Sequence, residues 1–268
     1  MPVHIWGHLT TEEFAALDPS RTLALLPVGA TEQHGPHLPL ATDILITEAV
    51  LAAASERVPD NLMLLILPSQ AIGLSPEHMS FVGTLTQAAE TLIASWTEIG
   101  RSVAAAGVRK LILLNSHGGQ PQIVDIVAQR LRSEAGMLAV RANTFRFDIP
   151  DGMIDPDEMK HGLHGGQIET ALMLAIAPEL VRTAKIADFP NSAEARTARS
   201  KRLGLSGAGG FAWNAEDLNP SGATGAASRA TADQGAALLA AYGQQLADLI
   251  ADVADWPLSD GAPFGEQR

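Results

Sequence analysis

The chain has 268 residues, 46% of them hydrophobic and only 4% aromatic, so it is long enough to bury a large, mainly aliphatic core. A formal net charge of -12 and the lack of any basic run argue against nucleic acid as a partner. The absence of cysteine excludes disulfides, thiolate catalysis and cysteine-based zinc sites, so any metal ligand must be His, Asp or Glu.

Location and domain organisation follow from what the sequence lacks. No apolar segment reaches the roughly 18 residues of a membrane helix, and the N-terminus shows no signal-peptide pattern. We therefore expect a cytoplasmic protein without membrane contact. Because no linker or repeat divides the sequence, we predict one domain over residues 1–268, with a loose C-terminal tail from about residue 258.

Short apolar runs predict buried strands, and segments of helical periodicity lie between them. The predicted strands cover residues 23–28, 62–67, 110–114 and 137–140. The predicted helices cover residues 10–19, 43–57, 121–134, 171–177 and 231–253, with a further one that Thr84 or Thr86 caps and that ends at Gly107. Because strand and helix alternate, we predict an α/β fold, a three-layer αβα sandwich with a mostly parallel central sheet. The acidic segment 144–163 is expected to be a solvated, irregular loop near the mouth of a pocket.

A cluster of possible metal ligands follows the first predicted strand. Glu32 and His34 stand two residues apart in extended chain, so their side chains point the same way, and Asp43 begins a predicted helix. An aspartate at such a corner can bridge two ions, and mixed nitrogen and oxygen ligands suit Zn, Mn or Fe(II). The alternative is that Glu32 and His34 are solvated loop residues and that Asp43 only caps a helix. For any one of these residues alone this would be the better explanation, but three within twelve positions favour a metal site.

Three later segments carry further polar side chains. The loop 69–83 contains Glu77 and His78, and loops of this length are often functional. His78 is interpreted as a solvated residue, a pocket residue or a subunit contact. His117 follows the third predicted strand, at the sheet edge where ligands gather in α/β proteins. Glu169 enters an apolar helix, where either a metal ion or a salt bridge to an arginine must pair its carboxylate.

Four stretches, taken together and in this order, resemble the signature of the creatininase family of metal-dependent amidohydrolases. They are Gly29-Ala-Thr-Glu-Gln-His-Gly-Pro-His-Leu-Pro-Leu-Ala-Thr-Asp43, Ser75-Pro-Glu-His-Met-Ser-Phe-Val-Gly-Thr84, Asn115-Ser-His-Gly-Gly119 and His164-Gly-Gly-Gln-Ile-Glu-Thr170. The resemblance implies a creatininase-like fold and hydrolysis of a C–N amide bond in a small cyclic or linear amide. It also implies a homo-oligomer, often a hexamer in this family.

The same resemblance implies two divalent metal ions per subunit, Zn²⁺ in the first place and Mn²⁺ or Fe²⁺ as alternatives. One ion would bind Glu32, Asp43 and His117, and the other would bind His34, Asp43 and Glu169, with Asp43 bridging them. A hydroxide bridging the ions would attack the amide. The catalytic residues would be His164 and Glu169, with His164 carrying the proton to the leaving nitrogen. The remaining candidates for substrate contact or support of the ligands are Gln33, His37, Glu77, His78 and Asn115.

The sequence departs from creatininase itself at two places. Creatininase has a carboxylate ligand two residues beyond the position of His117, where this chain has Gly119, so Glu169 would have to replace that carboxylate. The tryptophan-bearing loop associated with creatinine binding is not recognisable between residues 140 and 180, so creatinine is not the expected substrate. The alternatives are a maturation protein that cleaves a peptide precursor, and a non-catalytic family member that keeps the metal ions.

Overall fold

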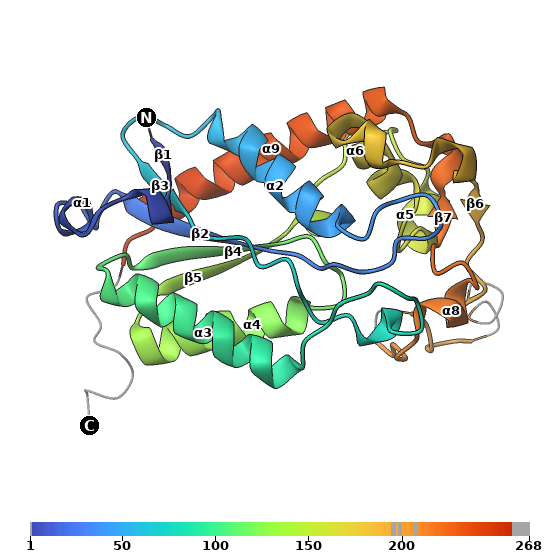
Figure 1. The fold of residues 1–268 in the computed structure, drawn as a ribbon, viewed down its shortest axis with the longest axis horizontal. Helices are drawn as coiled ribbons and strands as arrows, with labels where there is room; N and C mark the ends of the chain where they lie inside the picture. Colours follow the sequence, from blue (N-terminus) through green and yellow to red (C-terminus); the bar gives the residue numbers. More distant parts are fainter. Residues whose placement is uncertain (1, 194–196, 198–199, 206–207, 259–268) are drawn as a thin grey trace.

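The computed structural model describes residues 2–193, 197, 200–205 and 208–258, and a sheet of five parallel strands lies at its centre (Figure 1). The strands are β1 (Val3–Ile5), β2 (Thr22–Val28), β3 (Met63–Ile66), β4 (Lys110–Asn115) and β5 (Leu138–Asn143), in the sheet order β1-β3-β2-β4-β5. The predicted strands are confirmed, with shifted ends. Strand β1 was not predicted, because its three residues at the sheet edge form no apolar run.

The sheet is buried on both faces. Every residue of the central strand β2 is buried, as expected for a parallel sheet covered on both sides. Leu23 and Leu25 pack into the core on one face, while Ala24 and Leu26 pack into the core on the other. Successive side chains of a strand point to opposite faces, so one apolar run supplies both cores.

Helices cover the two faces and complete three layers (Figure 1). One face carries α2 (Thr42–Ser55), α6 (Gln167–Ile176) and α9 (Ala232–Asp255), and the other carries α3 (Ala89–Ala105) and α4 (Pro121–Ala135). The three-layer αβα prediction is confirmed. None of the helices in the described part of the chain has the length and apolarity needed to cross a membrane.

Shorter elements connect these layers. The short α-helices are α1 (Thr11–Ala15), α5 (Pro156–His161) and α8 (Ala215–Leu218), and β6 (Asp188–Phe189) pairs antiparallel with β7 (Gly225–Ala226). The 3-10 helices are η1 (Trp6–His8), η2 (Pro76–His78), η3 (Thr144–Arg146), η4 (Pro178–Leu180), η5 (Thr183–Lys185) and η6 (Ala227–Arg229).

The predicted cap of α3 was wrong. The helix begins at Ala89 after an N-cap alanine that makes no side-chain bond. Thr84 Oγ1 instead accepts a hydrogen bond from Gln33 N at 3.2 Å, and Thr86 Oγ1 accepts one from Ser75 N at 2.8 Å. Both hydroxyls therefore stabilise the loop before α3, because they accept hydrogen bonds from the backbone amides of Gln33 and Ser75 and not from amides of the helix.

The acidic segment 144–163 is less irregular than predicted, since it contains η3 and α5. Glu158 of α5 is only 5% exposed. Its carboxylate accepts hydrogen bonds from Gln167 N and Ala226 N, each at 2.7 Å. The prediction of a solvated loop was wrong for this residue, whose carboxylate joins the start of α6 to β7.

The long C-terminal helix is confirmed. Thr231 caps α9 and accepts a hydrogen bond from Gln234 N, while the Gln234 side chain returns the contact in a capping box. The predicted loose tail from residue 258 onward lies almost wholly outside the described residues.

A glycine lets α9 approach α6, the helix that carries Glu169. A Cβ at Gly235 would lie 1.8 Å from the carbonyl oxygen of Ala171. We expect Gly235→Ala to lower the free energy of unfolding by about 1–3 kcal/mol through overpacking, although alanine normally favours a helix over glycine by about 1 kcal/mol. Denaturant unfolding followed by circular dichroism would measure this, with Ala240→Ser at an exposed position of α9 as the control. An unchanged or raised midpoint would contradict the close crossing.

Candidate metal centre

The segment between β2 and α2 places three candidate ligands at the carboxyl edge of the sheet. Glu32 and His34 are 0% exposed and Asp43 is 2% exposed. Among the described residues, four of their buried atoms have no hydrogen-bond partner: both Glu32 carboxylate oxygens, His34 Nε2 and Asp43 Oδ2. Buried polar atoms nearly always have a partner. These atoms form a set of nitrogen and oxygen donors that fits a metal ion.

Backbone carbonyls fix which nitrogen of each histidine faces this set. His34 Nδ1 donates to the carbonyl of Glu32 at 3.0 Å, so its Nε2 lone pair lies 3.3 Å from Asp43 Oδ1. His117 Nε2 donates to the carbonyl of Leu74 at 2.7 Å. Its Nδ1 then lies 3.1 Å from Glu32 Oε1 and 3.4 Å from Asp43 Oδ2. A lone pair facing a carboxylate is unfavourable unless a proton or a cation lies between them.

The charges in this region are strongly coupled. Burial by itself would lower the pKa of His34, but the Asp43 carboxylate raises it to about 10. Burial would likewise lower the pKa of His117, yet the Glu32 carboxylate raises it well above 6.5. In turn, His117 and His34 keep the pKa values of Glu32 and Asp43 below their usual range in spite of burial. The two carboxylates are therefore ionised, and positive charge is required beside them.

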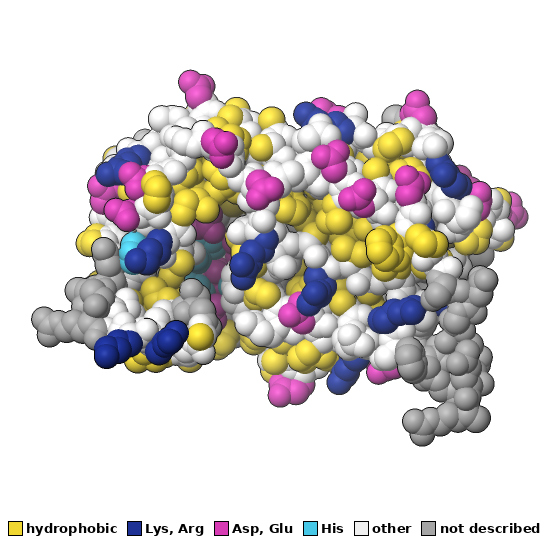
Figure 2. Space-filling view, turned by 180° about the vertical axis from the view of Figure 1, so that it is seen from behind, with side chains coloured by type: hydrophobic (Ala, Val, Ile, Leu, Met, Phe, Trp, Pro, Cys, Tyr) yellow, Lys and Arg dark blue, Asp and Glu magenta, His cyan; other side chains and the backbone are white. Residues whose placement is uncertain are grey.

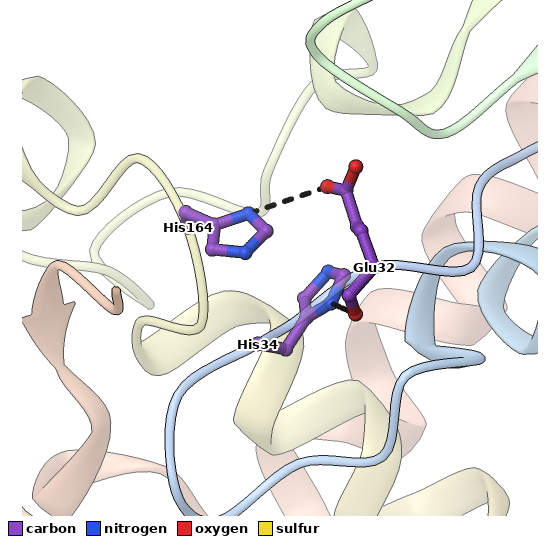
Figure 3. A group of neighbouring side chains, drawn as sticks. All are labelled: Glu32, His34 and His164. Carbon is purple, nitrogen blue, oxygen red and sulfur yellow. Dashed lines mark hydrogen bonds and ion pairs between the residues drawn. The ribbon is translucent and has the colours of Figure 1, made fainter. Parts of the chain in front are cut away.

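Three overlapping groups of side chains have ligand atoms within 4.8 Å of one another. They are Glu32, His34 and His164 (Figure 3), Glu32, Glu77 and His117, and His34, Asp43 and Glu169. The third group is the ligand set predicted for one ion. In the other predicted set, His117 Nδ1 lies close to carboxylate oxygens of both Glu32 and Asp43. The Glu77 carboxylate, which is not in that set, lies near Glu32 and His117.

His164 lies before the first turn of α6, as predicted. It forms an antiparallel bridge with Thr224, and its Nε2 donates to the carbonyl of Gln33. Its Nδ1 faces Glu32 Oε1 at 3.8 Å (Figure 3). Burial, followed by the nearby His34, lowers the pKa of His164. The ring is therefore neutral, with the lone pair of Nδ1 directed at the centre.

Gln33 determines the tautomer of His78. Gln33 Oε1 accepts from Gly35 N at 2.8 Å, and Nε2 donates to the carbonyl of Gly222 at 2.9 Å, so the amide has one possible orientation. Nε2 also donates to His78 Nδ1 at 2.7 Å. His78 Nε2 therefore carries the proton and faces Glu32 Oε1 at 3.3 Å. Burial, and then His164, lowers the pKa of His78 to about 3, which keeps the ring neutral.

The comparisons with known proteins identify the family of the chain. The family model "Creatininase: Creatinine amidohydrolase" matches residues 7–250. The chain belongs to the creatininase family. The predicted resemblance, fold class and function as an amidohydrolase of this family are thus confirmed.

Individual creatininase-family relatives match most of the chain. A "Mycofactocin precursor peptide peptidase" of Mycobacterium ulcerans (strain Agy99) is 33% identical over 268 residues, covering 97% of this chain and 96% of that protein. A "Creatinine amidohydrolase" of Pseudomonas putida is 30% identical over 202 residues, covering 69% and 76%. A solved structure of a creatinine amidohydrolase (creatininase) superimposes with a TM-score of 0.72 at 27% identity, covering 94% of this chain and 98% of that one.

Two other predicted site residues of this creatininase-family chain lie outside the three groups. His37 Nε2 and Thr170 Oγ1 are 2.8 Å apart, and the His37 ring stacks on Phe189 at 5.2 Å. Asn115 Nδ2 donates to the His117 carbonyl at 2.9 Å, and Asn115 Oδ1 accepts from His117 N at 3.1 Å. Asn115 thus holds the backbone of His117, while His37 packs against α6 and β6.

Gln120, which the sequence analysis missed, supports the same region. Its Nε2 donates to the carbonyl of Gly29 at 3.1 Å and to Asn115 Oδ1 at 2.9 Å, and its Oε1 accepts from Leu74 N at 3.2 Å. One buried amide therefore ties together the segments that follow β2, β3 and β4. A polar residue just before Pro121 at a helix start was the only available signal, and it is a weak one.

The centre is not completely closed to solvent. Figure 2 shows a hollow in which histidine and acidic side chains are visible. The Glu77 and His164 side chains keep 15% and 11% of their surface exposed, whereas that of Glu32 keeps 1%. Glu77 and His164 are therefore more accessible to a substrate than Glu32 is.

Proposed function

We propose that this protein is an amidohydrolase with a dinuclear metal centre that cleaves a C–N amide bond with water. One observation carries the proposal. The two oxygens of Asp43 face different histidines, with Oδ1 3.3 Å from His34 Nε2 and Oδ2 3.4 Å from His117 Nδ1. A carboxylate arranged in this way is suited to bridge two ions.

The donor set also bears on which metals would bind. Imidazole and carboxylate ligands suit Zn²⁺, Mn²⁺ and Fe²⁺, and the chain has no cysteine. One solved relative is named "Creatininase Mn", and a solved mutant creatininase is described as "Zn-Zn type". We therefore propose two divalent ions per subunit, Zn²⁺ first and Mn²⁺ or Fe²⁺ as alternatives.

The protein residues supply the remaining chemistry. Bound divalent ions lower the pKa of a coordinated water and polarise the substrate carbonyl. His164 Nδ1 faces the centre with a free lone pair, because the Gln33 carbonyl holds the proton on Nε2. The neutral ring can accept the proton that the water loses and donate it to the leaving nitrogen. His78 Nε2 faces Glu32 Oε1 at 3.3 Å without a hydrogen bond, and this contact helps to position the carboxylate.

Two substrate classes are favoured by different observations. The relative that matches 97% of the chain is named a precursor peptide peptidase, which favours an amide in a peptide-derived substrate. The Pseudomonas putida relative, named a creatinine amidohydrolase, favours the small cyclic amide predicted from the sequence. No tryptophan occurs between residues 140 and 180, which argues against creatinine itself. We propose a peptide-derived amide first and a small cyclic amide second.

Chelation followed by metal addition tests the proposal. The purified full-length chain would be stripped with a chelator, reloaded with Zn²⁺, Mn²⁺ or Fe²⁺, and assayed on short peptides, cyclic amides and formamides. We expect hydrolysis of at least one class to disappear on chelation and to return with metal. Hydrolysis that persists in the stripped protein, or that is absent from every class after reloading, would contradict the proposal.

We also propose a homo-oligomer, and a hexamer in particular. Met79, Val82 and Leu85 in the loop before α3 are 52%, 101% and 49% exposed. Exposed apolar side chains this close together in sequence suit a contact with another protein chain. A cytoplasmic location stays a prediction from the sequence.

A further inference from the structure

Glu77 brings a carboxylate to the centre that neither predicted ligand set includes. Its ligand oxygen lies within 4.8 Å of ligand atoms of Glu32 and His117. Glu77 lies in η2, in the loop between β3 and α3. The centre thus receives a side chain from a further segment, besides those that follow β2 and β4 and the start of α6.

A glycine leaves the space that this carboxylate occupies. A Cβ at Gly119 would lie 2.1 Å from Glu77 Oε1 and 2.6 Å from His117 Nε2. The φ angle of Gly119 is outside the left-handed region, so its backbone conformation does not require glycine. Glycine is instead needed here because of the limited space. Any other residue would displace the Glu77 carboxylate or the His117 ring.

The loop that carries Glu77 is already attached to His117 on the side away from Glu32. His117 Nε2 donates to the carbonyl of Leu74 at 2.7 Å, and Ser75 N donates to Thr86 Oγ1 at 2.8 Å. The Glu77 side chain is only 15% exposed and lies among other acidic groups. An ionised carboxylate in such a place is costly unless a cation faces it.

We propose that Glu77 is a ligand of the metal ion bound by Glu32 and His117, an assignment that rests on the metal centre of the proposed function. Binding of this ion then holds the loop 69–88 against the centre. The charges agree with this assignment. The four carboxylates of the centre balance two divalent cations; they are Glu32, Asp43, Glu77 and Glu169.

Calorimetric titration of Mn²⁺ or Zn²⁺ into the chelator-treated full-length chain tests the assignment without any activity assay. For Glu77→Gln we expect one ion to bind as in the wild type and the other to bind at least about 10-fold more weakly, the scale of losses around metal sites. Glu77→Asp, which keeps the charge on a shorter side chain, should weaken the same ion. The control is Glu90→Gln, an exposed acid in the first turn of α3, which should bind both ions like the wild type.

Hydrogen exchange provides a second readout. Mn²⁺ should slow amide exchange in the loop 69–88 of the wild type and leave it unchanged in Glu77→Gln. If Glu77→Gln binds both ions with wild-type affinity, Glu77 is not a ligand, and the proposed function stands. If the wild type binds neither Mn²⁺ nor Zn²⁺, the proposed function and the assignment both fail. Should Glu77→Gln not fold, as judged by circular dichroism, Glu77→Asp tests the same ion, because its shorter side chain withdraws the carboxylate while keeping the charge.

Discussion

Replacing Asp43 by asparagine should weaken the binding of both metal ions while leaving the chain folded. The asparagine has the same shape but only one acceptor oxygen and no charge. Because Oδ1 and Oδ2 of Asp43 face His34 and His117 respectively, either orientation of the amide leaves at least one ion with an NH₂ group in place of a carboxylate oxygen. The loss of the negative charge affects both ions.

Metal analysis after gel filtration, together with calorimetric titration, would measure the effect. We expect the affinity for each ion to fall by at least about 100-fold, since even changes beside metal ligands cost about 10–100-fold. Glu48→Gln is the matched control, because Glu48 lies in the same helix, is exposed and accepts a hydrogen bond from Ser69. Loss of a single ion, with the other bound as in the wild type, would show that Asp43 does not bridge.

The local part of the site was predictable from the sequence because it depends on neighbouring residues. Side chains two residues apart in extended chain point to the same side, which predicts that Glu32 and His34 lie together. Asp43 stands close to them in sequence, at the start of the next helix. The apolar runs predicted the central strands for a similar reason, since each run supplies both faces of the sheet. His117 was predictable because the carboxyl ends of parallel strands meet at one edge.

The remaining part depends on segments that meet only in the folded chain. Which nitrogen of His117 faces the ions is set by the carbonyl of Leu74, and the tautomer of His78 is set by Gln33. Sequence patterns contain no information about such contacts. For the same reason the sequence predicts a solvated acid at Glu158, although the backbone amides of Gln167 and Ala226 donate hydrogen bonds to its carboxylate.

Gly119 shows how a departure from a family pattern can become understandable in the structure. In the sequence, this glycine was a missing ligand beside His117. In the fold, the carboxylate of Glu77 occupies the space that a side chain at position 119 would need. The sequence assigns the replacement to Glu169, and only the folded chain also brings Glu77 of η2 beside His117 and Gly119.

Replacing His164 by alanine should abolish most turnover while both ions remain bound. A positioned acid–base group contributes about 10²–10⁴-fold to rate, so kcat on an active amide should fall by that factor. The KM should change little, since the Nδ1 of His164 faces the centre while its Nε2 only contacts the Gln33 carbonyl. Steady-state kinetics and metal analysis on the same preparation would measure both effects.

The comparison needs controls for folding and for histidine loss in general. His8→Ala removes an exposed histidine far from the centre in sequence and should leave kcat unchanged. His164→Gln keeps a side chain that can donate to the Gln33 carbonyl, so it should keep the local structure but not the rate. If the glutamine variant turned over substrate like the wild type, proton transfer by His164 would be excluded.

Metal content decides between the two roles that the geometry gives to His164. Its Nδ1 lies near Glu32 and His34 as a third possible ligand group, so the ring could bind an ion instead of moving a proton. Loss of an ion together with activity in His164→Ala would assign it as a ligand. Retention of both ions with a large fall in kcat would assign the proton transfer to Nδ1, because its free lone pair faces the centre and the neighbouring carboxylates would be bound to the ions.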